Sequence, residues 1–412
     1  MSKKVLIVLV LALLPVMLFA GGQKAASAGA QPTDIAIGSV WSVTGVAAPL
    51  GQAQQKGSEL AVELANDGGG IMGHEIVYQN IDGQSDTAII SSAAKRLAEE
   101  RQVVAAIGGE DDSLTSAMGP VFQDAGVPFV IGSATTPTQP RMGSYVFMTA
   151  FGDNQQGQAA AQYMADKLGW KKIAVMWDNA SAYSTLLSEY IVSSFKKATG
   201  DAQAVPFQEV YQTGDTQFTA QLTRIKNARV KIDGLVVTPP FPQDGPIIAK
   251  QAKALGLDVQ FFFTDGADDK TLTEVGGSAV EGATISTQFA SERPLTEMGD
   301  RFVEAYRQKY GEMPGAFEDI GFDNMQIIIE AITVIMEKEG ADGWDAMSLA
   351  ERRTAIRDTI QSHKFVTTTV PISYPDPATA EFPRVPLKPV YFKTVKNGQR
   401  VYLDHFMPEQ FM

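Results

Sequence analysis

Polar and aromatic side chains follow the ends of several predicted strands, and their types suit the binding of a small charged molecule. The set comprises Ser113, Ser133 and Thr135 in the first half of the chain, and Tyr183, Phe241 and Asp265 in the second. The hydroxyl groups of the first half can donate hydrogen bonds, and the Asp265 carboxylate can accept them. A zwitterion would match this pair, because both of its charged ends would form charge-assisted hydrogen bonds.

The stretch from Ala105 to Ser116 carries the best candidate for an anion-binding position. It predicts a buried strand that stops at Gly108-Gly109 and a helix that begins near Ser113, a residue type suited to capping. A helix N-terminus offers unpaired N–H groups and a partial positive charge, so it favours a carboxylate. The alternative is that the polar residues before the helix only cap it, which is the commoner arrangement for such a stretch taken alone. Asp265 has a similar alternative, as an ordinary turn aspartate before Gly266.

No pattern in the sequence predicts catalysis, a metal site or a cofactor. The three histidines, His74, His363 and His405, are far apart, and cysteine is absent. The motifs H-E-x-x-H and G-x-S-x-G, the Walker loop and the calcium loop are also missing. The glycine run from Gly68 to Gly73 matches G-x-G-x-x-G, but it lies between a helix and a strand and is interpreted as a turn. We therefore expect no catalytic residues, no metal and no cofactor.

Composition indicates a globular protein of two domains. The chain has 412 residues, of which 44% are hydrophobic and 20% are charged. The formal net charge is −13, and no basic block or basic-aromatic interleaving occurs. Nucleic acid is therefore not an expected partner.

The N-terminal segment has the features of a secretory signal peptide. Lys3 and Lys4 precede an apolar run from Val5 to Phe19, and small residues follow. We assign residues 1–30 to a signal peptide and linker, cleaved after Ala20 or between positions 26 and 30. The absence of cysteine leaves no sulfur for a lipid anchor, so the mature protein is expected to be periplasmic or secreted. A retained N-terminal anchor is the alternative.

Strand and helix patterns alternate along the chain, which is typical of doubly wound α/β domains. Predicted strands lie at 35–40, 75–81, 103–107, 128–131, 172–177, 207–211, 234–238 and 260–264. Two such domains in tandem would place their strand ends at a shared cleft, where ligands of open parallel sheets bind. Helices predicted at 296–310, 317–337 and 349–362 complete these domains, and strands at 390–395 and 401–406 flank an Asn397-Gly398 turn.

The chain resembles periplasmic amino-acid-binding proteins of the leucine/isoleucine/valine-binding type, which are the solute receptors of ABC importers. The resemblance runs from about Asp34 to the C-terminus. Its main segments are Thr44-Gly45 through Gly51, Asn66 to Gly73 with Asp82, Ala106 to Ser116, Ala125-Gly126-Val127-Pro128 with Ser133-Ala134-Thr135, Asp178 to Ser184, Thr264-Asp265-Gly266 and Gly321-Phe322-Asp323. Each segment is a weak signal singly, and their order and spacing together are specific.

The resemblance implies an α/β fold of the type I periplasmic binding protein, with two doubly wound parallel-sheet lobes joined by three crossovers and closing on ligand by a hinge. The crossovers are expected at 149–153, 282–288 and 365–372. The N-terminal lobe is then expected to hold residues 31–150 and 288–365. The C-terminal lobe is expected to hold residues 151–287 and 366–412.

The resemblance also implies roles for particular residues. Ser113 and Thr135 would hold the ligand carboxylate, with help from the backbone of Ser133 and Ala134. Asp265 would hold the ammonium. Tyr183 and Phe241 would cover the ligand from the second lobe, and Leu50 would lie beside the ligand side chain.

Three features depart from the family pattern. Asp265 stands where a longer glutamate is expected, and Phe241 lacks the hydroxyl of a tyrosine. The triplet Glu110-Asp111-Asp112 stands where relatives carry small or apolar residues. The triplet is explained either as favourable charge at a helix start, or as excess negative potential in the cleft that prefers a cationic side chain or a polyamine.

The sequence thus predicts a solute receptor that binds an amino acid, branched-chain or otherwise aliphatic, works with an ABC transporter permease and is a monomer. The alternatives are a receptor for a cationic amino acid, a polyamine or a small amide, and a ligand-sensing module with a signalling partner. A hydrolase would need a nucleophile paired with a base, and no such pairing is found.

Overall fold

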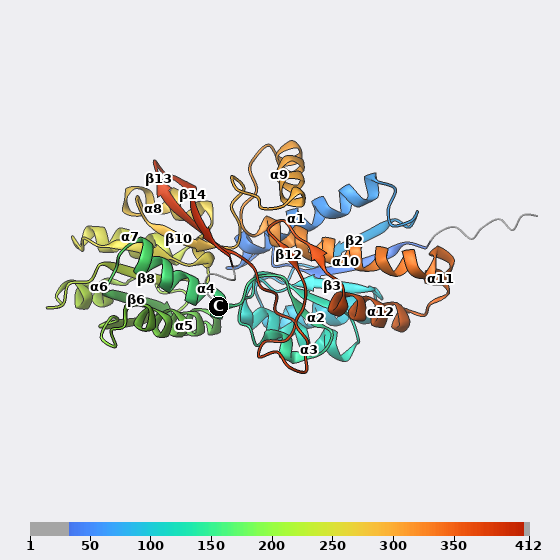
Figure 1. Ribbon diagram of the computed structural model, residues 1–412, viewed down its shortest axis with the longest axis horizontal. Coiled ribbons are helices and arrows are strands. Elements are labelled where there is room, and N and C mark those ends of the chain that lie inside the picture. The colour runs from blue at the N-terminus through green and yellow to red at the C-terminus, as the bar shows by residue number, and fades with distance from the viewer. Residues whose placement is uncertain (1–32, 408–412) are drawn as a thin grey trace, which may run out of the picture. The chain divides into compact units, whose positions relative to one another are not determined.

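The computed structural model of the protein describes residues 33–407, which form two lobes that are each built around one β-sheet (Figure 1). The predicted signal peptide and linker at residues 1–30 lie outside the described residues. Of the helices between residues 33 and 407, none is long and apolar enough to cross a membrane.

The sheet of the first lobe has five parallel strands in the order β2-β1-β3-β4-β5. Their bounds are β1 Ile35–Val40, β2 Ile76–Asn80, β3 Ala105–Gly108, β4 Phe129–Ile131 and β5 Val146–Met148. The central strands are short apolar runs, because both faces of the sheet are covered by helices. Alternate residues face opposite sides: Ile107 packs in one core cluster and Ala106 in the other.

Seven helices accompany this sheet. They are α1 Ala48–Asp67, α2 Thr87–Glu99, α3 Asp112–Asp124, α9 Glu297–Tyr310, α10 Glu318–Glu339, α11 Ala341–Ala346 and α12 Leu349–Ser362. The buried face of α10 carries Ile328, Ala331, Ile332 and Ile335, at the spacing of an amphipathic helix. These side chains share a core cluster with residues of the first sheet.

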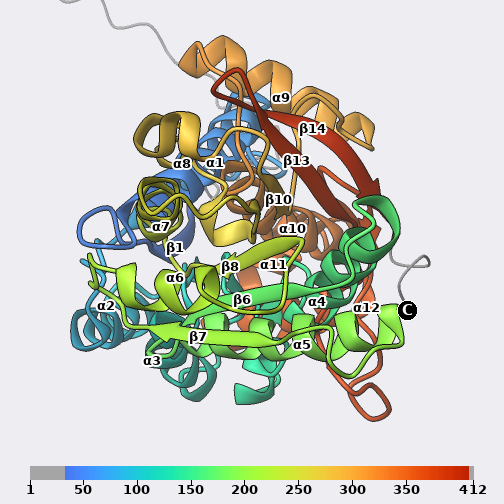
Figure 2. The same ribbon diagram turned by 90° about the vertical axis from the view of Figure 1, so that its left-hand side faces the viewer.

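The sheet of the second lobe has seven strands in the order β14-β13-β10-β9-β8-β6-β7 (Figure 2). Its strands are β6 Ile173–Asp178, β7 Phe207–Tyr211, β8 Gly234–Thr238, β9 Gln260–Phe263, β10 Thr284–Thr287, β13 Val390–Lys396 and β14 Gln399–Phe406. Its helices are α4 Asp153–Gln162, α5 Ala182–Thr199, α6 Thr219–Lys226, α7 Asp244–Ala254 and α8 Lys270–Gly276. Core clusters lie on both faces, one with α4 and α5 and one with α6, α7 and α8.

Strands β13 and β14 form the antiparallel edge of the second sheet. The turn between them contains Asn397 at φ 54° and Gly398 at φ 71°. Two successive positive φ values are typical of the type I′ hairpin turn that Asn-Gly favours. The predicted hairpin is confirmed.

Short elements interrupt the main pattern. They are the 3₁₀ helices Gln139–Met142, Asp265–Ala267 and Gly277–Ala279, the π-helix Tyr163–Lys167 and the strand pair β11 Phe365–Val366 and β12 Pro371–Ile372. The π-helix continues α4 directly. The sequence predicted one helix from Asn154 to Leu168, which covers α4 and the π-helix, and it predicted none of the 3₁₀ helices.

Both lobes repeat one strand order. The first sheet runs β2-β1-β3-β4-β5, and the corresponding part of the second runs β7-β6-β8-β9-β10. In sheets of this order, ligands bind beyond the carboxyl ends of the strands, near the point where the strand order reverses. The loops after β3, β4, β8 and β9 are therefore placed to carry a binding site.

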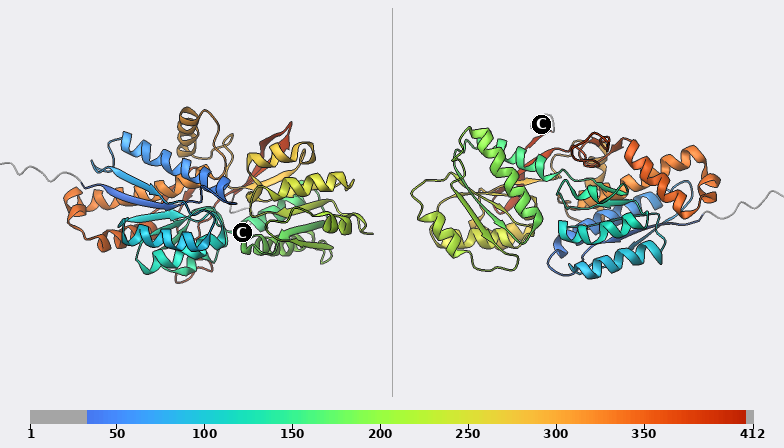
Figure 3. Two further views of the ribbon diagram at one scale, coloured as in Figure 1. Left: turned by 180° about the vertical axis from the view of Figure 1, so that it is seen from behind. Right: turned by 90° about the horizontal axis from the view of Figure 1, so that it is seen from below.

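Three connections pass between the sheets, after β5, after β10 and before β13 (Figure 3). The segment before β13 stays against the first lobe: Tyr374 packs on Phe147 with ring centroids 5.2 Å apart. Arg384 Nε donates to the carbonyl of Val146 at 3.0 Å, and the Met148 N–H donates to the Arg384 carbonyl at 3.0 Å. The assignment of residues to lobes stays a prediction. Because of these contacts, we propose that the third crossing follows Val385 rather than lying at 365–372.

Candidate functional site

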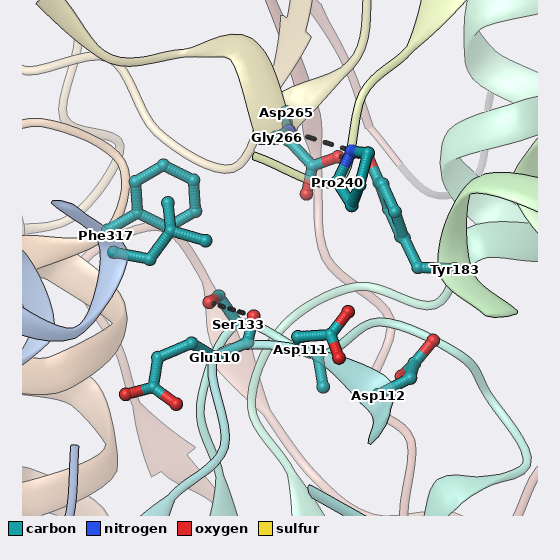
Figure 4. A pocket seen from close by; sticks show the side chains of 11 residues that line it. Glu110, Asp111, Asp112, Ser133, Tyr183, Pro240, Asp265, Gly266 and Phe317 are labelled. Carbon is teal, nitrogen blue, oxygen red and sulfur yellow. Dashed lines mark hydrogen bonds between the residues drawn. The ribbon is translucent and has the colours of Figure 1, made fainter. Parts of the chain in front are cut away.

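A pocket of about 290 Å³, part of it open to solvent, lies where strand ends of the two sheets face each other (Figure 4). Only about 20 Å³ of this space can hold the centre of a water molecule, so the pocket is narrower than a usual small-molecule site. The residues that line it are Leu50, Glu110, Asp111, Asp112, Ser133, Ala134 and Phe317 from the first lobe, and Tyr183, Pro240, Asp265 and Gly266 from the second. Five of the eight residues predicted from the sequence line this pocket, together with the acidic triplet.

The turn after β3 positions the acidic triplet. Gly109 has φ 88°, and a Cβ atom there would lie 2.2 Å from Thr115 Oγ1, so the turn requires glycine. Helix α3 then begins at Asp112 with Asp111 as its N-cap, whose Oδ1 accepts from the Ser113 N–H at 2.8 Å. The capping residue is therefore Asp111 and not Ser113. Favourable charge at a helix start therefore explains Asp111, which is the cap, and Asp112, which lies in the first turn of α3.

Ser113 itself is exposed and lies outside the pocket lining. Its hydroxyl donates to Asp111 Oδ1. Ser133 does line the pocket, and its hydroxyl donates to the Glu110 carbonyl at 3.0 Å while accepting from Gln54 Nε2 at 3.0 Å. Both serine hydroxyl groups are thus engaged with the protein.

Glu110 is buried beneath the pocket, with 3% of its surface exposed. Its Oε1 accepts from the Ser42 N–H, whereas its Oε2 is buried and has no hydrogen-bond partner. Burial raises the pKa of the Glu110 carboxyl to about 7, and the nearby charges of Asp111 and Asp82 act in the same direction. This side chain therefore changes its charge near neutral pH.

Asp112 belongs to a buried carboxyl pair with Asp153. The Thr136 hydroxyl donates to Asp112 Oδ2 and lies 3.2 Å from Asp153 Oδ2. Burial raises the pKa of both carboxyl groups, and each carboxylate would repel the charge on its neighbours. One hydroxyl has a single proton to donate, so a proton retained on Asp153 lets both carboxyl groups bond to Thr136.

Asp265 lies on the opposite wall, directly after β9, and is 2% exposed. Its Oδ1 accepts from the Tyr183 hydroxyl at 2.6 Å and from Gln156 Nε2 at 2.8 Å. Burial raises the pKa of the Asp265 carboxyl, and the hydrogen bonds from Tyr183 and Gln156 oppose that rise. Figure 4 shows one Asp265 oxygen near Tyr183 and the other directed into the pocket.

Three predicted residues take other positions. Thr135 is fully buried with its hydroxyl unpaired, and it does not line the pocket. Phe241 of the second lobe belongs to a core cluster with Leu50 and Phe317 of the first lobe, beside the pocket. Its neighbour Pro240 lines the pocket instead. The third, Ser113, is exposed in the first turn of α3.

The structure adds lining residues that the sequence did not assign. Phe317 comes from the segment before α10, far along the chain from the other first-lobe residues, and no local motif marks it. Gly266 carries a signal that could have been used, because it follows Asp265 in a motif of the resemblance. A Cβ atom at Gly266 would lie 2.1 Å from the Pro239 carbonyl oxygen, so only glycine allows this close approach.

A family model described as periplasmic binding protein matches residues 34–367. The chain belongs to the periplasmic binding protein family. A relative from Pseudomonas aeruginosa, the leucine-, isoleucine-, valine-, threonine- and alanine-binding protein, is 27% identical over 292 residues, which is 70% of this chain and 75% of the relative.

Solved structures of similar proteins share the fold of this periplasmic binding protein. The branched-chain amino acid transporter substrate binding protein LivJ from Streptococcus pneumoniae, in complex with isoleucine, has a TM-score of 0.79 at 26% identity, covering 91% of this chain and 100% of that one. A leucine binding protein, LivK from Thermotoga maritima, has a TM-score of 0.78 at 25% identity, covering 91% and 99%. The type I periplasmic binding fold predicted from the sequence is confirmed. The protein is a solute-binding protein of the ABC transporter type and not an enzyme.

Proposed function

We propose that this periplasmic binding protein takes a small solute with a protonated amine into the pocket between its lobes and presents the closed form to the permease of an ABC importer. Asp265 is the observation that carries the proposal. It is a buried carboxylate on the pocket wall, with one oxygen fixed by Tyr183 and Gln156 and the other directed into the pocket. An ammonium group at that oxygen would form a charge-assisted hydrogen bond.

The names of the relatives favour an aliphatic amino acid as the ligand class. The apolar part of the pocket wall supports an aliphatic body, because Leu50, Ala134, Pro240 and Phe317 contribute to it. Micromolar affinity needs roughly 8 kcal/mol. A buried ion pair together with an aliphatic chain in contact with these four residues can supply that amount for a ligand of this size.

Ligand binding is coupled to lobe closure in this proposal. The pocket is lined from both lobes. Phe241 of the second lobe belongs to the same core cluster as Leu50, and Gln243 Nε2 donates to the Val46 carbonyl at 3.2 Å. A ligand that touches both walls binds the closed arrangement better than the open one and shifts the population toward it. Residues 1–30 would direct the chain out of the cytoplasm, and the mature protein would act as a monomer.

The test is the isosteric substitution Asp265→Asn, measured by calorimetry with primary amines and amino acids as probes. We expect the affinity to fall by at least about thirtyfold, because a buried ion pair loses one charged partner. The matched control is Asp258→Asn, which changes an exposed aspartate at the other end of β9. Unchanged affinity in Asp265→Asn with an unchanged thermal transition would overturn the assignment.

A further inference from the structure

Carboxylates line the pocket on both walls. Asp265 comes from the second lobe, and Glu110, Asp111 and Asp112 come from the first (Figure 4). Among the described residues that line the pocket, none is lysine, arginine or histidine. The protein thus surrounds its ligand with acidic groups and supplies no basic group to balance them.

Elsewhere the same chain neutralises its buried acids. Asp268 is fully buried and pairs with Lys393 at 2.8 Å and with Arg400, which lowers the pKa of its carboxyl. Asp323 is fully buried and pairs with Lys388 at 3.3 Å. Between residues 33 and 407, by contrast, the ion pairs include none of the four pocket carboxylates. The negative charge of these carboxylates can therefore be neutralised by a bound proton or by a cationic ligand.

Helix capping explains only part of the triplet. The Asp111 carboxylate caps α3 through Oδ1, but Glu110 bonds to Ser42 in a different segment and leaves Oε2 buried without a partner. An unpaired buried carboxylate oxygen is costly, and Figure 4 shows the Glu110 carboxyl below the pocket, directed away from Asp265, so Glu110 contributes negative charge beneath this wall. Within residues 33–407, no group of acidic or histidine side chains is arranged to hold a metal ion. The ligand chemistry that fits is an organic cation.

The first wall does not suit a ligand carboxylate. The hydroxyl groups of Ser113 and Ser133 donate to Asp111 Oδ1 and to the Glu110 carbonyl, and the Ser113 N–H is taken by the Asp111 cap. A carboxylate placed there would face three acidic side chains at short range, and like charges at close range are unfavourable. The helix-end charge that favours an anion is already balanced by Asp111 and Asp112.

We propose that this site binds a ligand that is cationic at both ends, a linear diamine or polyamine, with one amine at Asp265 and the second at the Glu110-Asp111-Asp112 triplet. This inference rests on the proposed function, since it takes the Asp265 wall as the first amine position. The proposed ligand carries a second amine where an amino acid carries its α-carboxylate. The aliphatic chain between the two amines would lie along Leu50, Pro240 and Phe317.

The decisive experiment compares ligands that differ by the α-carboxylate alone. Calorimetry with the full mature chain would use three pairs: lysine and cadaverine, arginine and agmatine, and leucine and 3-methylbutylamine. We expect cadaverine and agmatine to bind at least about tenfold more tightly than lysine and arginine. We also expect cadaverine to bind more tightly than the monoamine 3-methylbutylamine. Tighter binding of the amino acid in each pair would overturn the inference and would leave the role of Asp265 intact.

Variants of the triplet separate the two amine positions. Glu110→Gln and Asp111→Asn remove charge, and asparagine is as good an N-cap as aspartate, so α3 keeps its cap. The double variant should weaken cadaverine by at least about thirtyfold and 3-methylbutylamine far less, because the monoamine uses Asp265 alone. Equal losses for both probes would overturn the second amine position. Binding of the monoamine by the Asp265→Asn variant tests the proposed function separately. Circular dichroism with thermal unfolding identifies any variant that fails to fold.

Discussion

The Tyr183 hydroxyl lies 2.6 Å from Asp265 Oδ1 and donates a hydrogen bond to it. It also lies 2.9 Å from Thr264 Oγ1, so the phenol is held between the end of β9 and the carboxylate. In the amino-acid-binding proteins that this chain resembles, an aromatic residue at this position is expected to cover the ligand. In this chain the same side chain also orients the carboxylate that is proposed to bind the amine. Tyr183 is therefore a positioning residue as well as part of the pocket lining.

Tyr183→Phe should therefore weaken amine binding without opening the pocket. The substitution removes one hydrogen bond to a charged group, worth about 1.5–3 kcal/mol, so we expect a loss of at least about tenfold in cadaverine affinity. It should also raise the pKa of Asp265 further, because the Tyr183 hydrogen bond lowers it. Calorimetry over a series of pH values would show a loss that grows toward acidic pH. An equal loss at all pH values would argue for a wall contact only.

Ionisation of the Glu110 carboxyl should make the stability of the ligand-free protein depend on pH. Burial raises the pKa of its carboxyl from 4.5 to about 7. Between these values the folded protein keeps a proton that the unfolded chain releases, so stability falls as pH rises through this window. Asp111 and Asp82 are acidic and act in the same direction.

Thermal unfolding checks this expectation. The transition temperature should be lower at about pH 8 than at about pH 5.5, and Glu110→Gln should reduce that difference because it removes the ionising group. Cadaverine should raise the transition temperature more at the higher pH, where the carboxylate is charged. A variant with the same pH profile as the parent protein would show that Glu110 does not ionise in this range.

Local patterns predicted the regular elements well. The strand at residues 35–40 has the predicted bounds, because an apolar run marks it. The helix at residues 349–362 also has the predicted bounds, and Ser348 caps its start. Capping chemistry was less certain in the central stretch, where Asp111, Asp112 and Ser113 are all suitable caps. The structure selects Asp111, since the turn at Gly109 brings its carboxylate to the Ser113 N–H.

The site was only partly predictable because two of its properties depend on tertiary structure. Phe317 reaches the pocket from the start of α10, and Phe241 inserts into the first-lobe cluster while Pro240 takes the wall. The sequence also left open whether the acidic triplet caps a helix or charges the pocket. Periodicity cannot show that Glu110 turns toward Ser42 while Asp111 caps α3.

A buried ion pair stabilises the connection that leads into β13. Lys388 Nζ lies 3.3 Å from Asp323 Oδ2, and both side chains are fully buried. Lys388→Met should destabilise the protein by about 3–5 kcal/mol, because it leaves Asp323 without its cation. Denaturant unfolding would measure this change.

The double variant Lys388→Met with Asp323→Asn is the matched control for that pair. Asparagine can still accept from the Thr368 N–H, which lies 2.8 Å from Asp323 Oδ1, while it removes the unpaired charge. We expect the double variant to recover part of the lost stability. A double variant as unstable as the sum of the two single variants would show that the two residues do not interact.

Closure of the lobes should depend on Phe241. This side chain is 8% exposed and belongs to the core cluster that includes Leu50 and Phe317 of the first lobe, so we expect the open state to expose it to water. Phe241→Ala removes most of this contact and lowers the closed fraction, which reduces apparent affinity in proportion. We expect about tenfold weaker cadaverine binding or more, and a larger radius of gyration by small-angle X-ray scattering with ligand present. Val210→Ala, at an exposed position on β7, is the control. Unchanged affinity and an unchanged radius of gyration in Phe241→Ala would show that this contact does not hold the lobes together.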